Sequence, residues 1–180
     1  MSDSEFILLG DALWLDFVNT ARGRGKATDR LPDAAAYHRW SKASRVGSDA
    51  DVIGFSVVRR FRSRLIELAE ALHAGSAVPP SAIGAVNELL ARAAGHESLT
   101  REGGAWRLQF APAAVRTGLV AIAHSAAATL SNPGLGVHQC IAEGCTLFFA
   151  VPAGALERRW CSLEPCGRET RVERRRGAFR

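Results

Sequence analysis

The only four cysteines of this 180-residue chain lie within 27 residues near its C-terminus, with the spacing C-x4-C-x15-C-x4-C. They are Cys140, Cys145, Cys161 and Cys166. Two close pairs separated by a short span are typical of a tetrahedral metal site. Each pair supplies two thiolates from one turn, and the span lets the two turns face each other. Because four thiolates leave no open position for water, the spacing predicts a structural metal site and not a hydrolytic one.

Zinc is the metal that this ligand set favours, and one structural zinc ion is the cofactor that we expect. An iron site with the same ligands, two disulfides, and four separate buried thiols stay open as alternatives, as does replacement of one ligand by His138. The chain shows no signal-peptide pattern and no apolar stretch of about 18 residues. A cytoplasmic location is therefore expected, and a reducing cytoplasm disfavours disulfides.

A basic segment follows the last cysteine. The chain has a net charge of +5, and the residues from Cys166 to the end contain six arginines and two glutamates. If 163–176 is helical, three of these arginines lie on one face at i, i+3 and i+7, where they suit phosphate oxygens through bidentate hydrogen bonds. The candidate nucleic-acid-binding side chains are Arg158, Arg159, Arg168, Arg171, Arg174 and Arg175. The alternative is a solvated or protein-binding helix face. Since this segment contains no Asn or Gln, base readout would rest on arginine alone.

The remainder of the chain predicts a mainly helical N-terminal region. Apolar residues at three- and four-residue steps, namely Val58, Phe61, Leu65, Leu68 and Leu72, give the clearest helix. Further helices are expected over about 12–20, 34–44, 81–94 and 112–130. Pro32 and Asp33 mark one start, Ser81 is the expected cap of another, and Pro112 the expected start of the last. Alternating apolar residues on both sides of Glu102-Gly-Gly104 predict a small β-hairpin over 97–110.

We expect two domains, a helical one over 1–135 and a zinc finger over 136–180, joined near Ser131–Gly136. In the finger, Gly144 is suited to a positive φ beside the first cysteine pair, and 146–149 is predicted to be a short strand. Ser162 is the expected cap of a helix beginning at Leu163. Together these elements predict a treble-clef-like finger, made of a short hairpin and a helix.

The N-terminal segment offers a second, weaker candidate site. Trp14, Asp16, Asn19 and Trp40 could line a small-molecule pocket, but a helix that is simply capped near Asn19-Thr20 is the favoured interpretation. The scattered histidines have no partners at catalytic spacing, and no nucleophile elbow, Walker phosphate loop or H-E-x-x-H pattern is present. The sequence therefore does not predict an enzyme.

The segments Gln139-Cys-Ile-Ala-Glu-Gly-Cys-Thr-Leu-Phe-Phe149 and Arg158-Arg-Trp-Cys-Ser-Leu-Glu-Pro-Cys-Gly167 resemble the CGNR zinc finger. That finger is the C-terminal domain in a family of bacterial proteins described as stress-induced transcription regulators. Leu13-Trp-Leu-Asp-Phe-Val-Asn-Thr20 resembles the opening of the family's N-terminal domain, called ABATE. The resemblance implies that the four cysteines bind zinc. One departure is plain: Cys166-Gly167-Arg168-Glu169 stands where the family has Cys-Gly-Asn-Arg.

The resulting hypothesis is a bacterial transcription regulator that binds DNA through a four-cysteine zinc finger and an arginine-rich helix. The alternative is a zinc-stabilised protein-interaction module that does not touch nucleic acid. A small-molecule effector and a homo-oligomer stay open as partners, and no membrane partner is expected.

Overall fold

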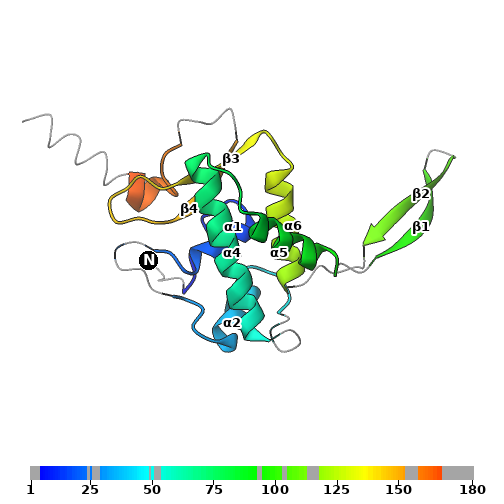
Figure 1. Ribbon diagram of the computed structural model, residues 1–180, viewed down its shortest axis with the longest axis horizontal. Coiled ribbons are helices and arrows are strands. Elements are labelled where there is room, and N and C mark those ends of the chain that lie inside the picture. Colours follow the sequence, from blue (N-terminus) through cyan, green and yellow to red (C-terminus); the bar gives the residue numbers. More distant parts are fainter. Residues whose placement is uncertain are drawn as a thin grey trace, which may run out of the picture.

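The computed structural model of the chain describes residues 5–23, 25, 29–48, 50, 54–92, 95–102, 105–112, 118–152 and 158–167. Over these residues the fold is mainly α, as predicted. It has five α-helices, one hairpin that projects from the body, and a second hairpin beside a four-cysteine cluster at the C-terminal end (Figure 1).

Helix α1 (Leu13–Asn19) lies at the centre of the body, where it packs against α4 (Phe55–Ala74), α6 (Gly118–Leu130) and one strand of the second hairpin. It is apolar on almost every side, as expected of a helix surrounded by other elements. Its fully buried apolar side chains are Trp14, Leu15, Phe17 and Val18. The prediction of a helix over about 12–20 is confirmed.

Helices α2 (Ala34–Ala43) and α4 follow the sequence prediction closely. The Asp33 carboxylate accepts a hydrogen bond from the Ala36 backbone N–H at 2.8 Å, so it caps α2 as its position suggested. The predicted stripe of α4 faces the core, with Val58, Phe61, Leu65 and Leu68 buried and Leu72 partly buried. Gly75, with a φ of +63°, ends α4 in the left-handed conformation that glycine adopts without strain.

Arg62 is the exception on α4, because its guanidinium turns inward and is only 6% exposed. Its two terminal nitrogens donate to the two carboxylate oxygens of Asp29, each at 2.8 Å, and Nη1 also donates to Thr20 Oγ1 at 3.0 Å. A buried charge needs such compensation. The pair ties the loop before α2 to the middle of α4.

Two predicted helix starts are wrong. Helix α5 spans Pro80–Leu90, and its first residue is Pro80, which needs no N–H partner at that position. Ser81 therefore lies inside the helix and makes no cap, and α5 ends before the predicted residue 94. Pro112 is the last residue of a strand and does not start a helix; α6 is described from Gly118 onward.

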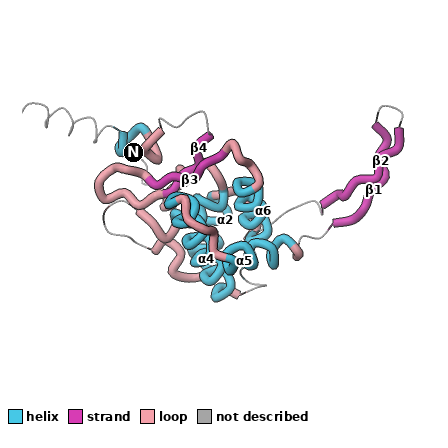
Figure 2. The backbone as a smooth tube through the Cα atoms, turned by 45° about the horizontal axis from the view of Figure 1, so that its top comes forward, coloured by secondary structure: helices cyan, strands magenta, loops and turns pink. Residues whose placement is uncertain are grey.

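The two hairpins differ in which elements they contact. Strands β1 (Gly95–Glu102) and β2 (Ala105–Pro112) pair antiparallel, with Leu99 opposite Leu108, and stand away from the body (Figure 2). Strands β3 (Leu135–Gln139) and β4 (Phe148–Pro152) pair antiparallel against α1 and α4. The strand predicted over 146–149 thus begins two residues later, and the expected linker already contains the first residues of β3.

One hydrophobic core joins the helices to the second hairpin. Val137 of β3 and Phe148 and Ala150 of β4 belong to the same buried cluster as the apolar residues of α1, α4 and α6. The predicted division at residue 135 stays a prediction, since β3 begins there and shares this core. None of the described helices combines the length and the apolar character that a bilayer crossing requires.

Candidate metal centre

The four cysteines come together from two loops, one after β3 and one after β4. Cys140 and Cys145 lie in a tight turn, held by hydrogen bonds from Cys140 N–H to the Leu147 carbonyl (2.9 Å) and from Cys145 N–H to the Ala142 carbonyl (3.0 Å). Gly144 has a φ of +67°, as predicted for this turn. The second loop is joined to the first by a hydrogen bond from Ile141 N–H to the Arg159 carbonyl at 3.1 Å.

Cys166 lies in a kinked helical turn (η2, Leu163–Gly167). Glu164 has extended backbone angles (φ −132°, ψ 130°), so a regular helix does not begin at Leu163 as predicted. The Ser162 hydroxyl donates to the Glu164 carbonyl at 2.9 Å, and Gly167 N–H donates to the Ser162 carbonyl. These bonds turn the chain sharply, so that Cys161 and Cys166 face the same point.

The four sulfur atoms fit a single tetrahedral ion. They all lie within 4.8 Å of one another, with Sγ–Sγ distances of 3.9 Å for Cys145–Cys161 and 3.6 Å for Cys161–Cys166. A metal held at about 2.3 Å by four thiolates needs sulfur–sulfur distances of about 3.8 Å. No two of the four are joined in a disulfide. The arrangement therefore suits a single ion held by four thiolates, and it leaves no room between the sulfurs for a multi-iron cluster.

The thiols are costly to ionise without a cation. Burial, and then the neighbouring Cys140 and Cys161, raise the pKa of Cys166 to about 12. The hydrogen bond with Cys161, followed by burial, raises the pKa of Cys145 well above its ordinary value. Four buried thiolates so close together require a positive ion among them, and binding that ion releases their protons.

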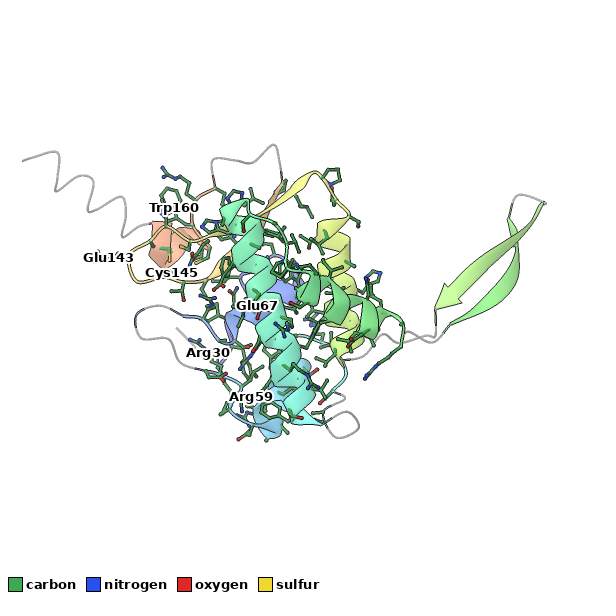
Figure 3. The ribbon with its side chains drawn as sticks, in the orientation of Figure 1. Arg30, Arg59, Glu67, Glu143, Cys145 and Trp160 are labelled. Atoms are coloured by element: carbon green, nitrogen blue, oxygen red, sulfur yellow. The ribbon has the colours of Figure 1, made fainter. Side chains whose placement is uncertain are left out.

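An apolar shell separates the cluster from water. All four cysteines are 7% exposed or less, and Leu147, Phe149 and Val151 are buried with them. Ile7 and Leu9 pack on this cluster from the N-terminal segment, and Trp160 packs on it from the second loop. Figure 3 shows Cys145 and Trp160 together at the end of the body opposite Arg59. Such a shell favours a structural ion over an exchangeable one.

Asn19 fixes β4 to α1. Its amide Nδ2 donates to the Phe148 carbonyl at 2.8 Å, and its Oδ1 accepts from the Phe148 N–H at 2.9 Å. Both backbone groups of Phe148, and the Nδ2 and Oδ1 atoms of Asn19, thereby have hydrogen-bond partners inside the core. A side chain of α1 thus helps to position the strand that leads away from the first cysteine pair.

A glycine-rich loop of the N-terminal region fastens the first cysteine turn. Thr146 N–H donates to the Gly23 carbonyl at 2.9 Å, and the Thr146 hydroxyl both donates to that carbonyl and accepts from the Gly23 N–H, each at 3.1 Å. Gly25 N–H donates to the Gly144 carbonyl at 2.7 Å. Nearer the N-terminus, the Gly10 carbonyl accepts from Ala150 N–H at 2.9 Å. The metal loops and the helical region therefore form one connected structure.

The side chain of Arg158, which was predicted to bind nucleic acid, contacts the loops that carry the cysteines. Its guanidinium donates to the carbonyls of Trp160 (3.1 Å) and Cys161 (2.8 Å), pairs with Asp11 at 2.7 Å, and lies over the Phe149 ring, 4.7 Å from its centroid. The only other predicted arginine among the described residues, Arg159, is exposed. Arg168, Arg171, Arg174 and Arg175 lie outside the described residues.

The four residues of the candidate ligand pocket do not line a common opening. Trp14, Asn19 and Trp40 are fully buried; Trp14 Nε1 donates to Thr129 Oγ1 at 2.9 Å, and Trp40 stacks on Tyr37. Asp16 is half-buried and accepts from the Gly10 N–H at 2.8 Å. Burial raises the pKa of this carboxyl to about 6. A solvent-open groove of about 490 Å³ lies elsewhere, between α4 and α5.

Sequence reasoning missed the residues that hold the cluster in place. Asn19, Gly23 and Thr146 carry no pattern that points to partners more than 120 residues away. The one available signal was the loop Arg22-Gly-Arg-Gly-Lys26, whose glycines allow close backbone approach.

Comparison with known families agrees with this geometry. Residues 137–177, which include all four cysteines, match the model of the CGNR zinc finger. Residues 11–133 match ABATE, described as "Putative stress-induced transcription regulator". The chain belongs to the ABATE family. The family's domain and its finger together account for both the helical body and the cysteine cluster. A search of curated proteins found no match.

Proposed function

We propose that this ABATE-family chain is a transcription regulator that binds duplex DNA through its C-terminal finger. The observation that carries the proposal is the four-cysteine cluster, built as a closed structural site within a chain of a transcription-regulator family. A closed site does no hydrolytic chemistry, and its function is to hold the segments on either side of it.

Zinc is the ion that fits this site. The donor set is four thiolates, the sulfur separations suit a tetrahedron with bonds of about 2.3 Å, and zinc imposes no other geometric demand. Purified protein should contain about one zinc per chain by elemental analysis. Folded protein with less than half an equivalent of any metal would refute the site.

The DNA contact is assigned to the arginines that follow Cys166, with Arg159 as the exposed cation of the preceding loop. Arg158 is excluded from it, because its guanidinium already binds two carbonyls and Asp11. The arginine-rich segment lies outside the described residues, and its role rests on its charge and spacing. Each phosphate that it neutralises adds about 0.9 to the slope of log affinity against log salt concentration.

The test is duplex DNA binding by the full-length, zinc-loaded chain, measured by fluorescence anisotropy at several salt concentrations. Arg171→Ala together with Arg175→Ala should weaken binding and reduce the salt slope by about 1.8. A matched control removes two exposed arginines from α4, Arg59→Ala with Arg60→Ala, and changes the net charge equally. The control should leave the slope close to that of the wild type.

The outcomes separate the two candidate functions. Selection from a random DNA pool would reveal whether binding is sequence-specific or directed to phosphates alone. Absence of binding at low salt would overturn the proposal and favour the zinc-stabilised protein-interaction module. A larger effect from the α4 control pair would move the DNA surface to the helical body.

A further inference from the structure

The projecting hairpin lacks a partner on its edges and faces within the part of the chain that the structure describes. Strands β1 and β2 contact chiefly each other, and both views show them standing clear of the helices (Figures 1 and 2). A lone two-stranded hairpin is marginally stable in water, whereas three or more strands with an apolar face are stable. The register places Leu99, Trp106, Leu108 and Phe110 on one face, together with Glu97 and Arg101.

The charged residues of β1 do not lie directly opposite charged residues of β2. In the observed register every ionisable residue of β1 lies directly opposite an uncharged residue of β2. The opposed pairs are His96 with Ala111, Glu97 with Phe110, Arg101 with Trp106 and Glu102 with Ala105. Opposite charges stabilise a sheet when they face each other across neighbouring strands. The register places Arg107 diagonal to Glu102, but within the described strands it places no opposite charge next to Glu97 or Arg101, so these two residues suit a strand on the other edge of β1.

The sequence of β1 is complementary to itself. In an antiparallel pair, two residues that lie directly opposite each other either both point their backbone N–H and C=O groups at the partner strand or both point them away. Residues that point the same way are two apart along a strand, so a two-fold pairing of β1 with β1 must be centred on a residue and not between two residues. Centred on Leu99, it places Glu97 opposite Arg101 of the second copy and Arg101 opposite Glu97. It also places His96 opposite Glu102, Ser98 opposite Thr100, and Leu99 opposite Leu99. A pairing centred on Ser98 would place Glu97 opposite Leu99, and one centred on Thr100 would place Arg101 opposite Leu99. In both cases the match between Glu97 and Arg101 is lost.

The edge of β2 is less suited to the same pairing. Centred on Leu108, it would place Arg107 opposite Gln109 and join no opposite charges. Strand β2 also ends in Pro112, which has no N–H to donate. The free edge of β1 is therefore the one that a second copy matches.

We propose that the chain forms a two-fold homodimer in which β1 pairs antiparallel with β1 of a second copy, centred on Leu99. The two hairpins then form one four-stranded sheet in the order β2-β1-β1-β2, with the apolar residues of both copies on one face and the Glu97–Arg101 pairs among them. The pairing covers an edge that would otherwise be open to non-specific strand addition. It does not depend on DNA binding, because it uses no residue of the finger.

The first test is the molar mass of the full-length, zinc-loaded chain without DNA, measured by sedimentation velocity over a range of concentrations. The chain has a mass of 19.3 kDa, so the dimer should sediment as a species of about 39 kDa. A chain that remains monomeric at all concentrations up to several hundred micromolar overturns the proposal.

The second test exchanges the charges. Glu97→Arg places two arginines opposite each other at both ends of the paired region, and Arg101→Glu places two glutamates there. Each variant alone should dissociate about ten-fold or more readily than the wild type. The double variant, Glu97→Arg with Arg101→Glu, should dimerise again. An equimolar mixture of the two single variants should form heterodimers, which misfolded chains could not do.

Arg107→Glu is the matched control, because it reverses one charge on β2, the other strand of the same hairpin. It should leave the dimer intact. A dimer that resists both single variants, or one that only Arg107→Glu dissociates, would show that the interface lies elsewhere and overturn the proposal.

Discussion

Asn19 is a single buried amide that completes the backbone hydrogen bonding of Phe148. Asn19→Ala would leave both the N–H and the carbonyl of Phe148 without partners in the core, which should cost about 2–4 kcal/mol of unfolding free energy. Urea denaturation followed by circular dichroism measures this loss. Asn87→Ala, at an exposed position of α5, is the matched control and should change stability by less than about 0.5 kcal/mol. Equal effects of the two substitutions would contradict this role.

Asp16 makes the stability of the fold depend on pH. Burial raises the pKa of its carboxyl from 3.8 to about 6, so between about pH 4 and pH 6 the folded chain holds a proton that the unfolded chain has lost. Stability from this group is therefore complete below pH 4, falls as pH rises, and is lost above about pH 6. Asp16→Asn keeps an acceptor for the Gly10 N–H and removes the ionisation.

Relative to the wild type, Asp16→Asn should gain about 1–3 kcal/mol of unfolding free energy between pH 4.5 and pH 7.5. Urea denaturation of both proteins at the two pH values measures the gain, and taking the difference cancels effects that the two chains share, such as loss of metal in acid. A constant difference between the two proteins would show that the Asp16 carboxyl ionises normally.

At the scale of elements, Gly10 shows how closely the N-terminal segment approaches α1. A Cβ atom at this position would lie 2.7 Å from Leu15 Cβ and 2.9 Å from the Asp16 backbone nitrogen. Gly10→Ala should therefore displace the loop whose carbonyl holds β4 and cost about 1–3 kcal/mol. Gly84→Ala is the opposite case, since open space surrounds that position inside α5 and it should gain about 0.5–1 kcal/mol. Thermal unfolding should shift in opposite directions for the two variants; shifts in the same direction would contradict the argument.

The elements that local spacing determines were predictable. Val58, Phe61, Leu65 and Leu68 recur at helical steps and are buried, and the alternation around Gly103-Gly104 gave the hairpin. The first and last residues of the helices were less predictable. Pro80 and Ser81 are both residues that favour a helix start, and only the packed structure selects between them. The cysteine cluster was predictable, since metal ligands must be particular residue types at particular spacings. The contacts that position them are hydrogen bonds between distant segments, such as Gly23 with Thr146, and no local pattern encodes those.

At the scale of the whole molecule, the metal should stabilise the helices as well as the finger. β3 and β4 connect the cysteine loops to the common core through Val137, Phe148 and Ala150. Removing the ion with a chelator frees four cysteine ligands. The apparent free energy of zinc binding, which is also folding free energy, is about 10 kcal/mol in small zinc-finger peptides. We therefore expect the thermal midpoint of the helical signal to fall by about 10 °C or more, and zinc, but not magnesium, to restore it. Helices that melt at an unchanged temperature after zinc removal would show that the two regions fold independently.

The bond between Asn19 and Phe148 also bears on how this chain can be recombined. The two family matches meet between residues 133 and 137, which suggests a place to exchange one finger for another. A finger cut there would expose Phe148 and Ala150 and leave behind the amide, the glycine loop and the apolar N-terminal residues that enclose it. Exchange between relatives should succeed only when Asn19 and the loops around Gly10 and Gly23 travel with the finger. The two family matches cover separate stretches of the sequence, whereas the side chains that enclose the finger come from both.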